Sequence, residues 1–202
     1  HDKQHKENTM ASFANAERLG MWGIELDIQW TADNIPVVSH DKTLDRVWNK
    51  PIDITKTSFK QLRTACPEVP TLQETVNQFS ESLHLFIELK SSVPDSQALN
   101  DILSHLSPGQ DYHVISLQPQ HLKSATSIPM HHRLLVAQIN KYDTFIQECL
   151  THGYGGLLGH YTLLNQRRLR QLKRNNKKVG VGFIASPNNL KRQLNRQIKW
   201  LF

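Results

Sequence analysis

Apolar and polar residues alternate strictly along residues 24–29, which read I-E-L-D-I-Q. Alternation with a period of two predicts a β-strand whose side chains point to opposite faces in turn. On this strand Glu25 and Asp27 share one face, and the branched aliphatic residues share the other. After a turn, the short run 36–38 (P-V-V) brings the chain back, which places His40 toward the same end.

Residues 85–90 (L-F-I-E-L-K) repeat this alternation and put Glu88 and Lys90 on one face. If the two strands are neighbours, the carboxylates, the lysine and His40 converge on one spot. In a half-exposed antiparallel sheet the acids would simply face water, which is the ordinary meaning of an isolated E-x-D. The rest of the chain decides between these interpretations.

Strand-like and helix-like segments alternate through the rest of the sequence. Strands are expected at 112–117, 133–139, 155–160 and 178–184, and helices at 10–19, 58–64, from 71 onward, 96–106, 119–126, 143–151, 163–174 and 188–197. Regular alternation predicts an α/β fold with a parallel sheet covered on both faces, and the number of strands favours a TIM (β/α)8 barrel. Inward-facing acids at the carboxyl ends of barrel strands occupy the usual active-site rim, where they need a counter-charge.

Length and composition fit one domain spanning residues 1–202, since 38% of the residues are hydrophobic and nothing marks a linker. The net charge of +6 favours anionic partners. Cys66 and Cys149 lie far apart without metal-type spacing, which favours a reducing, cytoplasmic compartment, although removal of a signal peptide stays open. No apolar run approaches the roughly 20 residues of a membrane span.

A cluster of basic residues at 167–174 raises the question of nucleic-acid binding. Leu164, Leu169 and Leu172 give the same segment an apolar side, so the basic residues are expected to form the solvated face of a helix. We therefore expect a small-molecule partner and no nucleic acid.

Several motifs together resemble the glycerophosphodiester phosphodiesterase family. They are K-E-N-T-M-A-S-F-A-N-A (6–16), G-I-E-L-D (23–27), P-V-V-S-H-D-K-T-L-D-R (36–46), V-P-T-L-Q-E (69–74) and F-I-E-L-K (86–90). Their order and spacing match the family over roughly the first 90 residues, and their conjunction is specific although each motif alone is weak. The later half resembles the family only in its alternation of strands and helices.

The resemblance implies a TIM-barrel hydrolase that converts glycerophosphodiesters to sn-glycerol 3-phosphate and an alcohol with one divalent cation, in lipid and glycerol metabolism. By the match of motifs, Glu25, Asp27 and Glu88 bind the metal, and Lys90 lies near the phosphate. His40 is implied as one of two acid/base histidines. Glu7 is implied at the edge of the site, but it could equally be a charge at a helix N-terminus.

The family's other histidine opens an H-R-G motif, for which the only candidates are His1 and, less suitably, His5. Neither is followed by Arg-Gly, so the first barrel strand is expected to be missing from the sequence as given. Residues 200–202 (W-L-F) look like the opening of the eighth strand, so the last helix is expected to be missing as well. Residues 182–185 (G-F-I-A) also depart from the family's W-T-V-N, and residues 116–117 (S-L) depart from its S-F. The missing H-R-G and the departure at 182–185 keep open a non-catalytic barrel that binds metal and a phosphorylated ligand. A phospholipase D-like enzyme acting on lysophospholipid or sphingomyelin is a second alternative, which the E-N-T and V-P-T-L elements disfavour.

Three carboxylates without cysteine or clustered histidine ligands form a hard oxygen site, which suits Mg²⁺ or Ca²⁺. Histidines can remove a proton from the nucleophile and protonate the leaving alkoxide near neutral pH. The sequence does not decide which histidine does which. His40 and Asp41 after two valines could also form an ordinary turn.

Overall fold

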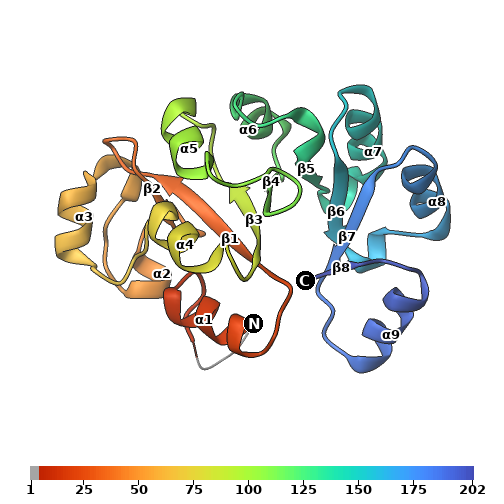
Figure 1. Ribbon diagram of the computed structural model, residues 1–202, viewed down its shortest axis with the longest axis horizontal. Helices are drawn as coiled ribbons and strands as arrows, with labels where there is room; N and C mark the ends of the chain where they lie inside the picture. Colours follow the sequence, from red (N-terminus) through yellow and green to blue (C-terminus); the bar gives the residue numbers. More distant parts are fainter. Residues whose placement is uncertain (1–4) are drawn as a thin grey trace. The chain divides into compact units, whose positions relative to one another are not determined.

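The computed structural model of the protein describes residues 5–202 (Figure 1). The chain divides into two compact units. The first contains the chain up to Val114 together with Gln120–Ile128, and the second contains Ile115–Pro119 together with Pro129–Phe202.

The first unit consists of a small sheet and the helices that follow its strands. Its elements are α1 (Met10–Arg18), β1 (Gly23–Trp30), β2 (Pro36–Val38), α2 (Asp45–Trp48), η1 (Ile54–Lys56), α3 (Phe59–Ala65), α4 (Leu72–Phe79), β3 (His84–Leu89), α5 (Ser96–Leu103), most of β4 (Tyr112–Ser116) and most of α6 (Pro119–Ser124). Within this unit the strand order is β2-β1-β3-β4.

The pairing of β1 with β3 sets the geometry of the first unit. The two strands are parallel, with Asp27 opposite Glu88, and β2 runs antiparallel along the last residues of β1. Ile24, Leu26 and Ile28 are all buried, so the aliphatic face is covered as the alternation predicted. The polar face therefore carries Glu25 and Asp27 of β1 beside Glu88 of β3.

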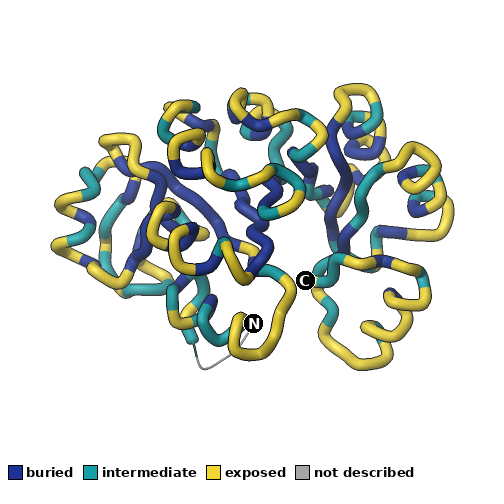
Figure 2. Tube along the Cα trace, in the orientation of Figure 1, coloured by how far each residue is buried: buried dark blue, intermediate teal, exposed yellow. Residues whose placement is uncertain are grey.

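The second unit repeats strand and helix with the period that the sequence predicted. Its elements are η2 (Met130–His132), β5 (Arg133–Val136), η3 (Ile139–Lys141), α7 (Tyr142–Thr151), β6 (Gly156–His160), η4 (Tyr161–Leu163), α8 (Gln166–Arg174), β7 (Lys178–Gly182), α9 (Pro187–Asn195) and β8 (Trp200–Leu201). The four strands pair in parallel in chain order. In both units the strands are largely buried and the outer faces of the helices are exposed (Figure 2).

Two strands of the second unit end earlier than the alternation predicted. The strand expected at 178–184 stops at Gly182, because Phe183 has a φ of 67°, which extended backbone does not allow. The strand expected at 133–139 stops at Val136, and Ile139 begins a 3₁₀ turn. In α8, Leu169 and Leu172 are buried while most of the basic residues are exposed, which confirms the expected solvated face.

Capping side chains fix the starts of the helices that flank β1 and β3. Thr9 begins α1 by accepting a hydrogen bond from the Ser12 amide, and Thr71 begins α4 by accepting one from the Glu74 amide. Glu74 in turn accepts from the Thr71 amide, which completes a capping box. Because Thr9 caps α1, the side chain of Asn8, one residue before this cap, is available to interact elsewhere.

The chain between β2 and α4 folds around a small core of its own. Val37 of β2 packs with buried apolar side chains of this segment, which are Leu44, Ile54, Leu62, Cys66 and Val69. The amide of Val38 donates to the Pro70 carbonyl at 2.7 Å, so the two ends of this segment are joined by a backbone hydrogen bond. The loop that carries His40 is therefore supported by packed structure on its outer side.

Cys66 and Cys149 are both buried free thiols. Between residues 5 and 202, none of the helices combines the length and the apolar character that crossing a bilayer requires.

Gly156 marks a point where β6 and β7 approach closely. A Cβ at this position would lie 2.2 Å from the carbonyl oxygen of Lys178, whereas a Cβ at Gly182 would meet no heavy atom closer than 3.9 Å. Gly156→Ala is therefore expected to lower the free energy of unfolding by about 1–3 kcal/mol, because a backbone atom would have to move. Gly182→Ala is the matched control and should stay within about 0.5 kcal/mol of the wild type. Urea denaturation of both variants checks this, and equal stabilities would contradict the close approach.

Candidate functional site

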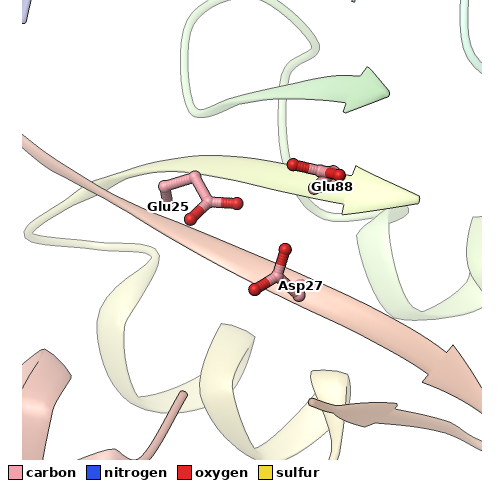
Figure 3. A group of neighbouring side chains, drawn as sticks. All are labelled: Glu25, Asp27 and Glu88. Atoms are coloured by element: carbon pink, nitrogen blue, oxygen red, sulfur yellow. The ribbon is translucent and has the colours of Figure 1, made fainter. Parts of the chain in front are cut away.

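Three carboxylates gather on the polar face of the β1–β3 pair. Figure 3 shows Glu25 and Asp27 on β1 beside Glu88 on β3. One carboxylate oxygen from each residue lies within 4.8 Å of the other two. The convergence expected from the two alternating stretches is therefore present, and it follows from the parallel register that puts Asp27 opposite Glu88.

Lys90 supplies the positive charge within this cluster. Its Nζ donates to Glu88 Oε1 at 2.6 Å and lies 2.9 Å from Asp27 Oδ1. The lysine and both of these acids are largely buried, with side-chain exposures of 16%, 11% and 7% for Lys90, Glu88 and Asp27. One ammonium group faces three carboxylates, so the cluster remains short of positive charge.

The pKa values of Glu25, Glu88 and Lys90 are all shifted in the direction that this excess of negative charge favours. Glu25 is exposed as a residue, although many protein atoms surround its carboxylate. This desolvation, followed by the negative charges of Asp27 and Glu88, raises the pKa of Glu25 well above its ordinary value. Burial also raises the pKa of Glu88, against the opposing effect of Lys90. Burial works to lower the pKa of Lys90, but Asp27 and Glu88 outweigh it and raise that pKa.

Asn8 contacts the cluster in a way that the sequence did not reveal. Its Nδ2 donates to Asp27 Oδ2 at 2.7 Å, and its Oδ1 accepts from the Asp27 amide at 3.1 Å. Asn8 has a φ of 56°, a left-handed conformation that asparagine tolerates better than most residues. This side chain therefore fixes the orientation of the Asp27 carboxylate.

The loop after β2 is tied to the same strand. The amide of Ser39 donates to the Asp27 carbonyl at 2.9 Å, and Gln29 Nε2 donates to the His40 carbonyl at 3.1 Å. Gln29 is buried on the strand face that carries the acids. Its place in the alternation after Glu25 and Asp27 was the only signal in the sequence that could have identified it.

His40 and Glu7 belong to one charged network at the edge of the cluster. His40 Nδ1 lies 2.7 Å from Asp41 Oδ1, and Arg46 Nε donates to Asp41 Oδ2 at 2.6 Å. Arg46 Nη2 also donates to Glu7 Oε1. The hydrogen bond from Arg46, followed by that with His40, lowers the pKa of Asp41. Glu7 thus contacts Arg46, and α2, which carries this arginine, was not expected from the sequence.

Of the two candidates for the second histidine, the structure describes only His5. His1 lies outside the described residues. His5 lines a groove that also includes Met10, Trp48 and Glu74.

The donor set of the cluster fits a hard divalent cation. It consists of carboxylate oxygens, which Mg²⁺ and Ca²⁺ prefer. Oxygens on opposite sides of a Ca²⁺ ion are about 5 Å apart, given Ca–O distances of about 2.3–2.6 Å, so the spacing of the three acids is compatible with shared ligation. The raised pKa values of Glu25 and Glu88 point the same way, because acids that resist ionisation together are relieved by a bound cation.

The related sequences belong to proteins that are named glycerophosphodiester phosphodiesterases. Glycerophosphodiester phosphodiesterase 1 of Homo sapiens is 34% identical over 98 residues, which cover 42% of this chain and 30% of that protein. The glycerophosphodiester phosphodiesterase of Bacillus subtilis is 28% identical over 205 residues, covering 83% of this chain and 68% of that protein. The chain thus matches less than a third of the length of the human relative.

Solved structures and a family profile extend the comparison. An Oleispira antarctica phosphodiesterase, determined in complex with the product sn-glycerol-3-phosphate, superposes with a TM-score of 0.81 at 24% identity, covering 98% of this chain and 87% of that one. At this identity the likeness shows the fold. The profile of the glycerophosphoryl diester phosphodiesterase family matches residues 1–202, the whole of the sequence. The chain therefore belongs to the glycerophosphoryl diester phosphodiesterase family.

Proposed function

We propose that this protein hydrolyses glycerophosphodiesters, such as glycerophosphocholine or glycerophosphoethanolamine, to sn-glycerol 3-phosphate and an alcohol. The observation that carries the proposal is the cluster of Glu25, Asp27 and Glu88 with Lys90, at the positions where the family motifs fall. Family membership and the names of the relatives support the same activity.

Glu25, Asp27 and Glu88 would hold one divalent cation, either Mg²⁺ or Ca²⁺. A cation bound there supplies Lewis-acid polarisation of the phosphoryl group and compensates charge in the transition state. Asn8 orients Asp27 through two hydrogen bonds. Lys90, which already neutralises part of the cluster, adds positive charge for an anionic diester.

His40 would act as one acid/base group. An ionised Asp41 can only accept hydrogen bonds, so the contact at 2.7 Å requires that His40 Nδ1 carries the proton. The neutral ring then presents an unprotonated Nε2, which can accept a proton from a nucleophile, and the protonated ring can return a proton to a leaving alkoxide. His1 remains the candidate for the partner histidine.

The regular βα order within each unit supports a TIM (β/α)8 barrel as the architecture of the domain. That residues 1–202 form a single domain and that the protein is cytoplasmic are further predictions.

The activity is testable with the full chain and glycerophosphocholine. We expect release of sn-glycerol 3-phosphate that EDTA abolishes and added Mg²⁺ or Ca²⁺ restores. His40→Ala should lower kcat by roughly 10²–10⁴-fold, because it removes one acid/base group. His152→Ala is the matched control, since this exposed histidine pairs with Glu148 on α7. Release of sn-glycerol 3-phosphate at the same rate with and without EDTA would contradict the proposal. So would equal kcat values for His40→Ala and His152→Ala.

Cation binding by the three acids is testable without turnover. Saturating Ca²⁺ or Mg²⁺ should raise the Tm of the wild type by several degrees, because a ligand at 100 times its Kd stabilises the folded state by about 2.7 kcal/mol. Glu88→Gln should lose this rise, whereas Glu81→Gln, which changes an exposed glutamate, should keep it. Each variant is compared with and without the cation, so any effect on folding cancels. A full rise in Glu88→Gln would place the cation elsewhere.

A further inference from the structure

Arg46 joins two segments that lie far apart in the sequence. Its Nε donates to Asp41 in the loop after β2, and its Nη2 donates to Glu7 in the segment before α1. The planar guanidinium group holds these two donors in a fixed fork, so each carboxylate constrains the position of the other. Arg46 is the second residue in a relay that runs from Glu7 through Arg46 and Asp41 to His40.

At one end of the relay, Arg46 orders the histidine. One oxygen of Asp41 accepts from Arg46 and the other contacts His40 Nδ1, so each oxygen has its own partner. A carboxylate held in this way fixes which ring nitrogen of its histidine carries the proton. The orientation and the tautomer of His40 therefore depend on a group that does not touch the ring.

At the other end, the relay reaches the acidic cluster. Glu7 directly precedes Asn8, whose side chain binds both the amide and the carboxylate of Asp27. Lys6 lies over the ring of Trp48 at 4.2 Å, so the same segment makes a second contact with α2. The short helix α2 thus clamps residues 6–8 against the site through Arg46 and Trp48.

We propose that Arg46 is a positioning residue that aligns His40 with the acidic cluster by holding Asp41 and Glu7 at once. This inference rests on the proposed hydrolysis for its kinetic consequence, but the state of the His40 ring can be observed separately. Arg46, Asp41 and Glu7 retain side-chain exposures of 52%, 30% and 28%. Exposed ion pairs contribute little to stability, so loss of Arg46 should alter the site and leave the fold intact.

The test compares Arg46→Ala with Arg63→Ala in the full chain. Arg63 is the matched control, because it makes two hydrogen bonds to Glu74, at 2.7 and 2.8 Å, in the same unit without touching the site. For Arg46→Ala we expect kcat on glycerophosphocholine to fall roughly 100-fold, as for a misplaced catalytic group, with a much smaller change in KM. Arg46→Lys should restore kcat about tenfold relative to Arg46→Ala. The recovery should be incomplete, because one ammonium group cannot hold both carboxylates in the same geometry.

¹⁵N NMR of the neutral His40 ring, at alkaline pH, supplies the second measurement. The wild type and Arg63→Ala should show the proton on Nδ1, and Arg46→Ala should show a reduced share of that tautomer. A kcat for Arg46→Ala within twofold of Arg63→Ala, or an unchanged tautomer, overturns the proposal. If the wild type releases no sn-glycerol 3-phosphate, the proposed function fails and the tautomer alone decides the role of Arg46. Should Arg46→Ala not fold, Arg46→Lys carries the same two measurements.

Discussion

The parallel register of β1 and β3 is the constraint on which the candidate site depends. It sets Asp27 opposite Glu88 and puts Glu25 two residues earlier on the same face. Because the side-chain period of a strand is two, a slip of one residue would turn the Glu88 face toward the buried aliphatic side. The covered faces of β1 and β3, where Leu26, Ile28, Leu85 and Ile87 are fully buried, make such a slip costly. Apolar packing on one face therefore specifies the acidic geometry on the other.

The acidic geometry in turn explains why so many polar contacts surround it. Lys90 neutralises part of the charge, Asn8 directs Asp27, and the Ser39 amide binds the Asp27 carbonyl. A group of buried carboxylates is tolerated only where hydrogen bonds or cations offset desolvation. Raised pKa values at Glu25 and Glu88 show that these contacts compensate incompletely. Residual demand for positive charge is what makes the cluster suited to hold a cation.

Much of the fold and the centre of the site were predictable, because both follow from local periodicity. The alternation in 24–29 and 85–90 predicted the strands and the shared faces of the acids, and the βα order predicted the parallel sheets. Asparagine commonly caps helices, but here Thr9 caps α1 and the Asn8 side chain binds Asp27 instead. Arg46 was missed because its partners, Glu7 and Asp41, meet it only after the excursion between β2 and α4 has folded. Periodicity carries no information about such contacts.

In the segment between β2 and α4, one set of residues packs the core and another set forms the polar network beside the site. The apolar residues of this segment pack with Val37 of β2 in one buried cluster, in which Leu44 and Ile54 are fully buried. The polar residues of the same segment, His40, Asp41 and Arg46, remain partly exposed and contribute little to stability. Because the core fixes the backbone on one side and Ser39 fixes it to β1 on the other, the exposed groups need only a few hydrogen bonds to keep their orientation. A histidine that must gain and lose a proton can therefore stay accessible to solvent and still be held close to the acidic cluster.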